Sequence, residues 1–189
     1  LLAGVSPLLT SAPAPDVAGL FSYLLVIVGG FLWIVYLKGW RIITPIALLI
    51  VYLYSLPFVS LSSSDSEEAL ALLFSFIFTA LFFGAHVMTI LKERAEKLVG
   101  EHIVVAIGIG LYLITWILAG VADEWQSLVF VAWAIAFGFG AFLVYAYTTR
   151  REPFYVYACV GIALIGAATA VELSGPALTI AYTLSLIHI

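Results

Sequence analysis

Charge is scarce in this chain, and it is absent from the long apolar stretches. Of 189 residues, 10% are charged and 65% are hydrophobic, and the mean hydropathy is +1.20. One soluble core of this size cannot hide so much apolar surface, which excludes an ordinary soluble domain and makes a lipid bilayer the expected partner. The net charge is only -4 and the basic residues form short clusters beside apolar runs, so we expect no nucleic-acid partner.

Cysteine and the usual catalytic motifs are also lacking. The single Cys159 excludes an internal disulfide, and its apolar neighbours make its thiol a poor nucleophile. No phosphate-binding glycine loop, metal-spaced His and Cys cluster or nucleophile elbow occurs. We therefore expect no catalytic residue, no cofactor-binding residue, no metal ligand and no cofactor, and the pattern argues against an enzyme without excluding one.

What the chain does have is apolar runs about as long as a bilayer is thick. A helix needs roughly 20 mostly apolar residues to cross a hydrocarbon core of about 30 Å. Six runs meet this need, namely Val17 to Leu37, Ile42 to Val59, Ala69 to Ile90, Ile103 to Val121, Ser127 to Tyr147 and Phe154 to Val171. A seventh begins at Ala177 and is interrupted at Leu184. The predicted fold is an all-α, polytopic helical integral membrane protein, with six complete transmembrane helices plus a truncated seventh in antiparallel hairpins.

The two ends of the chain do not read as part of this domain. Residues 1–16 look like the tail of a preceding segment followed by a Pro-rich outer linker. Residues 17–183 are the expected helical transmembrane domain, interpreted as a fragment of a longer protein whose remaining helices would be its partners. Residues 184–189, LSLIHI, resemble the translation of a sequencing adapter; the alternative is a natural helix that continues.

The charged residues between the runs alternate in sign. If each run crosses once, all seven basic residues fall on one side, while the other side collects seven of the eleven acids. Because Lys and Arg near span ends stay in the cytoplasm, that side is predicted to be cytoplasmic. The residues that determine this topology are Lys38, Arg41, Lys92, Arg94, Lys97, Arg150 and Arg151.

The segment from Leu91 to His102 is the central turnaround. Oppositely charged pairs four residues apart predict that the third helix continues past the membrane to a stop at Gly100. The acidic pairs Asp123–Glu124 and Glu67–Glu68 are interpreted as solvated helix caps rather than as acid and base of an enzyme.

Two further patterns predict how the helices sit. Small residues at four-residue spacing predict that the fifth and sixth spans pack as an antiparallel hairpin, although Ala and Gly are also common in any apolar helix. The two small-residue stripes are Ala132, Ala136 and Gly140, and Cys159, Ala163 and Ala167. The predicted aromatic belts consist of Tyr145, Tyr147, Tyr155 and Tyr157 on the inner side, and Tyr52, Tyr54, Trp116 and Trp125 on the outer side.

His86 is the one clearly ionisable residue within a run and the only candidate for a polar site in the membrane. It lies four residues from the end of its run, roughly 6 Å deep. A cavity residue, a substrate ligand or a metal ligand is one interpretation. We favour a structural role, with a neutral ring hydrogen-bonded to backbone, for which His86→Gln should be tolerated.

From about Lys38 onward the chain resembles the DUF2339 family of predicted multi-pass bacterial membrane proteins. The resemblance is carried by KGWRIITPIALLIVYLYSLPF, LFFGAHVMTILKERAEKL and EPFYVYACVGIALIGAATAVELSGPALTIAYTL. Where the family pattern leads us to expect an acidic residue, this chain has Ser185. The resemblance implies a large helical membrane protein with more spans and no settled role, and it transfers no functional residue.

We therefore expect a multi-pass integral membrane protein of the bacterial cell envelope, located in the plasma (inner) membrane. A transporter-like or lipid-handling role is the first hypothesis, because of the number of spans and the small-residue stripes. A structural or assembly scaffold for envelope proteins, and a membrane-embedded glycan or lipid enzyme, stay open.

Overall fold

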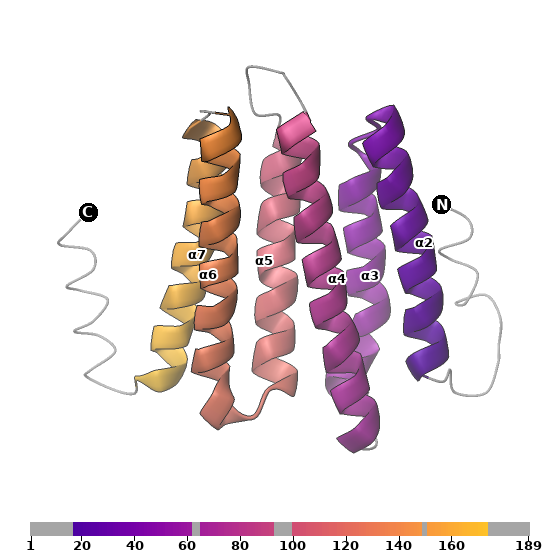
Figure 1. Ribbon diagram of the computed structural model, residues 1–189. Helices are drawn as coiled ribbons and strands as arrows, with labels where there is room; N and C mark the ends of the chain where they lie inside the picture. The colour runs from indigo at the N-terminus through magenta and orange to yellow at the C-terminus, as the bar shows by residue number, and fades with distance from the viewer. Residues whose placement is uncertain (1–16, 62–64, 93–99, 149–150, 174–189) are drawn as a thin grey trace.

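A computed structural model describes residues 17–61, 65–92, 100–148 and 151–173, and within these ranges every regular element is an α-helix (Figure 1). The helices are α2 (Val17–Lys38), α3 (Ile43–Leu61), α4 (Asp65–Lys92), α5 (Gly100–Gly120), α6 (Asp123–Thr148) and α7 (Arg151–Glu172). The predicted all-α class is confirmed.

The predicted number of complete spans is not confirmed. In the described part of the chain, five helices are long and apolar enough to cross a membrane, and α3 offers only the shorter apolar segment Ile43–Val59. Those 17 residues rise about 26 Å, less than a hydrocarbon core of about 30 Å. The structure therefore shows five long apolar helices and one shorter one, and the expectation of six complete spans is not confirmed. The seventh run, from Ala177, lies outside the described residues.

Successive helices run in opposite directions, so that one end of the bundle collects the C-terminal ends of α2 and α4 and the N-terminal ends of α3, α5 and α7 (Figure 1). Lys38, Lys92 and Arg151 are terminal residues of these helices, and Arg41 lies in the turn between α2 and α3. We call this the basic end. The predicted topology determinants Arg94, Lys97 and Arg150 lie outside the described residues.

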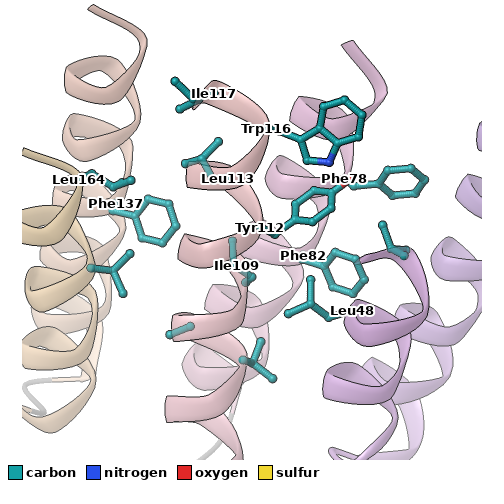
Figure 2. Packing of buried hydrophobic residues seen from close by; sticks show 14 of the residues in the cluster. Leu48, Phe78, Phe82, Ile109, Tyr112, Leu113, Trp116, Ile117, Phe137 and Leu164 are labelled. Atoms are coloured by element: carbon teal, nitrogen blue, oxygen red, sulfur yellow. The ribbon is translucent and has the colours of Figure 1, made fainter. Parts of the chain in front are cut away.

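Helices α4 and α5 form the central pair of the bundle. α4 packs against α2, α3, α5 and α6, and α5 packs against α3, α4, α6 and α7. Figure 2 shows the apolar side chains between them, including Phe78 and Phe82 from α4 and Tyr112 and Trp116 from α5, all at most 2% exposed. The core is therefore a continuous layer of large side chains through which every helix contacts a neighbour.

The outer faces of the helices are as apolar as the core. Val26, Ile135 and Ile162 expose 75%, 68% and 67% of their surface, and large hydrophobic residues are exposed on all six helices. Hydroxyl groups within the helices bond back to carbonyls of the same helix, as Thr79 does to Ser75 and Thr115 to Leu111. An apolar exterior with internally satisfied hydroxyls is what a lipid environment requires.

The predicted hairpin of the fifth and sixth spans is confirmed as α6 packed on α7, but its small-residue stripes are only partly in the contact. Cys159 and Ala163 are exposed, and Ala132 is exposed on α6. The buried face of α7 lies one position away and includes Gly161, where an added Cβ would lie 3.6 Å from the carbonyl oxygen of Ala134. Large residues between the stripes, rather than the stripes alone, decide which face is buried.

The predicted aromatic belts hold only for their exposed members. Tyr147, Tyr155 and Trp125 expose more than half of their surface, whereas Trp116 and Tyr157 are 2% and 0% exposed. Tyr54, at 8%, is also in the core. Position near a helix end therefore does not predict which side of the helix each ring faces.

The central turnaround is only partly described. α4 is described as far as Lys92 and α5 from Gly100, so the predicted continuation of the third helix over residues 93–99 lies outside the described part. At the opposite end, Asp123 and Glu124 lie in the first turn of α6, and the Asp123 carboxylate accepts a hydrogen bond of 3.0 Å from Gln126. This contact joins two side chains and involves no backbone N–H group of the first turn, so it does not test the capping role predicted for that acidic pair.

Candidate functional site

His86 is buried at the basic end of the bundle between two other polar side chains. Its Nε2 lies 3.0 Å from Nδ1 of His102, and its Nδ1 lies 2.7 Å from the hydroxyl oxygen of Tyr157. The three residues expose 4%, 5% and 0% of their surface. We call this group of hydrogen-bonded side chains the His–His–Tyr row.

Three helices supply the row. His86 lies on α4, two turns before its end, His102 lies in the first turn of α5, and Tyr157 lies in the second turn of α7. Because α4 and α5 are antiparallel neighbours, residues near the shared end of each helix come together. α7 also packs on α5, which brings its second turn to the same level.

The ring of Tyr157 is held by aromatic residues. Phe83 meets it edge-on, with ring centroids 5.5 Å apart, and Phe137 lies 6.2 Å away. Phe83 in turn lies against Gly140, where an added Cβ would come closer to the Phe83 ring than real Cβ contacts allow. The glycine therefore leaves the space in which Phe83, and through it Tyr157, is seated.

One arrangement of the hydrogens forms both hydrogen bonds of the row and leaves the Tyr157 hydroxyl hydrogen with an acceptor. Three neutral side chains share one hydroxyl hydrogen and one N–H on each ring. If Tyr157 donates to Nδ1 of His86, then Nε2–H of His86 donates to Nδ1 of His102, and the remaining N–H of His102 is directed away from the row. In the reverse arrangement the Tyr157 hydroxyl becomes an acceptor of the His86 hydrogen, and its own hydrogen, fully buried, lacks a partner within the row. A buried unsatisfied donor costs about 1–3 kcal/mol, so the first arrangement is favoured.

Both histidines border a small cavity of about 10 Å³. This is about the space that one water molecule occupies. Its wall is lined by residues of α2, the following turn, α3, α4 and α5, namely Leu32, Val35, Arg41, Thr44, Ala85, His86, Thr89, His102 and Val105. Arg41 is one of these lining residues, and no carboxylate is among the described residues that line the cavity.

The row brings together the two histidines that lie in the described part of the chain. Among the described residues, no group of three or more His, Cys, Asp or Glu side chains could hold a metal ion. The two facing ring nitrogens are instead at hydrogen-bonding distance from each other. The chemistry available to the row is therefore donation, acceptance and transfer of hydrogen.

Sequence reasoning identified His86 but missed both of its partners. His102 was read as the end of the charged turnaround, and Tyr157 as a member of an aromatic belt. The signal that was available is that two histidines flank the same turnaround, which an antiparallel hairpin brings together. Tyr157 gave no comparable signal, because nothing in the sequence says which face of α7 is buried. The expected bond of His86 to backbone is replaced by these two side-chain partners.

Of the predicted topology determinants, Lys38, Arg41 and Lys92 lie together near the ends of α2 and α4, and Arg151 lies apart from them at the start of α7. The Lys92 ammonium lies 4.2 Å from the centre of the Tyr36 ring and donates a hydrogen bond of 2.5 Å to the Tyr36 carbonyl oxygen. Lys92 therefore not only belongs to the basic end but also connects α4 with α2.

Comparison of the chain with protein-family models, with curated proteins and with solved structures found no match. The class of protein therefore rests on the fold itself. Five long helices with an apolar exterior are compatible with a multi-pass membrane protein and indicate a lipid bilayer as their surroundings.

Proposed function

We propose that this chain is a transporter-like protein of the bacterial inner membrane, in which the His–His–Tyr row accepts and passes a proton at the basic end. The observation that carries the proposal is the pair of hydrogen bonds, 3.0 Å and 2.7 Å, that joins α4, α5 and α7 through buried groups. Polar groups within membrane-spanning helices are costly and commonly mark ion or proton paths.

Protonation of the row has a mechanical consequence. In the favoured arrangement Nδ1 of His102 accepts a hydrogen, so this ring becomes an imidazolium only if the row reverses its hydrogens. This reversal of the hydrogens turns Tyr157 from donor to acceptor. The buried hydroxyl hydrogen of Tyr157 then lacks a partner within the row. Uptake of a proton by His102 on α5 therefore changes the hydrogen bonding of Tyr157 on α7. An alternating-access protein needs coupling of this type between its helices.

The surroundings favour passing a proton over storing it. Arg41 lines the cavity beside both histidines, so its positive charge repels an imidazolium there. The other groups facing the row are uncharged: Thr44 from α3, Thr89 from α4, and the aromatic rings around Tyr157. No carboxylate is among the described lining residues to hold the charge in place.

We also infer that the basic end faces the cytoplasm, because Lys and Arg near span ends are retained there. Membership of the DUF2339 family and the presence of further spans belong to the proposal as well, supported by the three sequence segments that carry the resemblance. A scaffold for envelope proteins, or a membrane-embedded enzyme, would need no proton movement through the row.

Proton movement in sealed vesicles tests the proposal. The purified chain is reconstituted into liposomes that contain a pH-sensitive dye, and acid is added outside while a potassium ionophore removes the electrical limit. We expect protein-dependent acidification in the wild type, its loss in His86→Gln and His102→Gln, and its retention in Tyr155→Phe, whose ring is 57% exposed on the same helix as Tyr157.

Helix content by circular dichroism shows that the variants compared are folded. If the wild type acidifies vesicles no faster than empty liposomes do, or if the two histidine variants acidify them as fast as the wild type, the row does not carry protons and the scaffold hypothesis moves ahead.

A further inference from the structure

A second cavity lies at the basic end, next to the one that the histidines border but larger and more open. It has a volume of about 290 Å³, and its wall is formed by Val35, Tyr36, Leu37, Lys38, Gly39, Arg41, Thr89 and Lys92. Three of these residues are cations, and none of the described lining residues is acidic. We call it the basic cavity.

The shape of the turn after α2 builds this cavity. Gly39 has a φ of 72°, a left-handed conformation that other residues adopt only with strain, and its N–H bonds the carbonyl of Val35 at 2.8 Å. This closes α2 and turns the chain back within a few residues to α3. Lys38 and Arg41, on either side of the turn, are thereby both held against the end of α4, where Lys92 lies.

Lys92 is held by contacts with Tyr36 and keeps hydrogen-bond donors for a ligand. Its ammonium donates one hydrogen bond to the Tyr36 carbonyl and lies over the Tyr36 ring. An ammonium has three N–H donors, so two stay available to a ligand in the cavity.

The outer surface beside the cavity is apolar. Leu37, Trp40 and Ile42 follow one another around the same turn and expose 56%, 62% and 61% of their surface. An exposed tryptophan at the end of membrane-crossing helices is typical of the headgroup level of a bilayer. Cations inside the cavity and apolar side chains beside it match the two parts of a phospholipid.

We propose that the basic cavity binds the phosphate of an anionic phospholipid headgroup, with Lys38, Arg41 and Lys92 contacting the phosphate oxygens and the acyl chains lying against the apolar surface of the turn. Basic pockets between helices on the cytoplasmic side are suited to such headgroups. A free phosphate would use the same cations, but it would gain nothing from Leu37, Trp40 and Ile42. The proposal is independent of proton transfer by the histidines.

The variants follow from the lining residues. Arg41 borders both cavities and is left unchanged, whereas Lys38 and Lys92 border only the basic cavity. Lys38→Gln and Lys92→Gln each remove one charge. The matched control is Arg151→Gln, which removes one charge from the same end of the bundle but outside the cavity.

Native mass spectrometry of the purified chain in neutral detergent measures binding of phosphatidylglycerol, phosphatidylcholine and soluble glycerol phosphate. We expect phosphatidylglycerol to be retained in preference to the other two, and Lys92→Gln to weaken its binding about 10- to 100-fold, as loss of a charge-assisted hydrogen bond does. Arg151→Gln should weaken it by about fivefold at most, the effect of general surface charge.

Thermal unfolding in the same detergent without lipid shows whether the Lys92 variant is folded, and Lys38→Gln supplies a second variant that does not touch the Tyr36 contact. Equal retention by wild type and both lysine variants, equal retention of phosphatidylcholine, or equally tight binding of glycerol phosphate would each overturn the lipid site.

Discussion

Removing one oxygen atom from Tyr157 tests the geometry of the His–His–Tyr row. Tyr157→Phe keeps the ring and its packing against Phe83 but deletes the hydroxyl that lies 2.7 Å from Nδ1 of His86. The tyrosine is 0% exposed, so water cannot take over the bond. The substitution therefore leaves a buried ring nitrogen without its donor.

Two ranges of hydrogen-bond energies determine the expected loss of stability. A buried polar group left unsatisfied costs about 1–3 kcal/mol. Hydrogen bonds between side chains of membrane-embedded helices average only about 0.6 kcal/mol and reach about 1.7 kcal/mol, because the unfolded chain in lipid also finds partners. We expect Tyr157→Phe to lower the free energy of unfolding by about 1–2 kcal/mol.

Unfolding of the purified chain in mixed micelles, with a rising fraction of a denaturing detergent and helix content as the signal, measures this change. The matched control is Tyr155→Phe, on the same helix but 57% exposed, for which we expect a change within about 0.5 kcal/mol. A double-mutant cycle with His86→Leu isolates the pair and should give a coupling of about 1 kcal/mol. Equal stability of both phenylalanine variants, together with a coupling near zero, would refute the hydrogen bond.

Two more predictions concern packing and topology. Gly140→Ala should destabilise the chain by about 1–3 kcal/mol, because its Cβ has no space beside the partly buried Phe83 ring of α4, whereas Gly138→Ala, with no atom within 4 Å, should be neutral or stabilising in the same unfolding assay. Single cysteines at Ser63 and Gly100, in a Cys159→Ala background, should react oppositely with an impermeant thiol reagent in intact cells. Labelling of both from outside would contradict the predicted sidedness.

The fold class was predictable because membrane-crossing helices are set by length and apolarity, both of which are visible in the sequence. The boundaries of α2 and α7 lie within a few residues of the predicted runs for the same reason. α3, Ile43–Leu61, also lies within two residues of the second run at each end, and Pro57 lies inside the helix without ending it. Which face of each helix is buried could not be read, since an apolar exterior gives no contrast with an apolar core.

This lack of contrast also explains the partial prediction of the site. His86 is distinct in an apolar run, so it could be singled out as a candidate from the sequence. Its partner Tyr157 was not, because a tyrosine near a span end is equally compatible with the headgroup level and with the core. Only the packing of α7 on α5, where the Val160 side chain lies against Gly110, decides between them.

The ring nitrogens of His86 offer the most direct test of the central claim, that three helices meet in one buried hydrogen-bonded row. Solid-state NMR of the chain in lipid bilayers, with isotopically labelled histidine, reports which ring nitrogens carry hydrogen. We predict that Nε2 of His86 is protonated and donates to Nδ1 of His102, that Nδ1 of His86 accepts, and that Tyr157→Phe shifts the Nδ1 signal while Tyr155→Phe does not. Signals of His86 that stay unchanged in both Tyr157→Phe and His102→Gln would contradict the row.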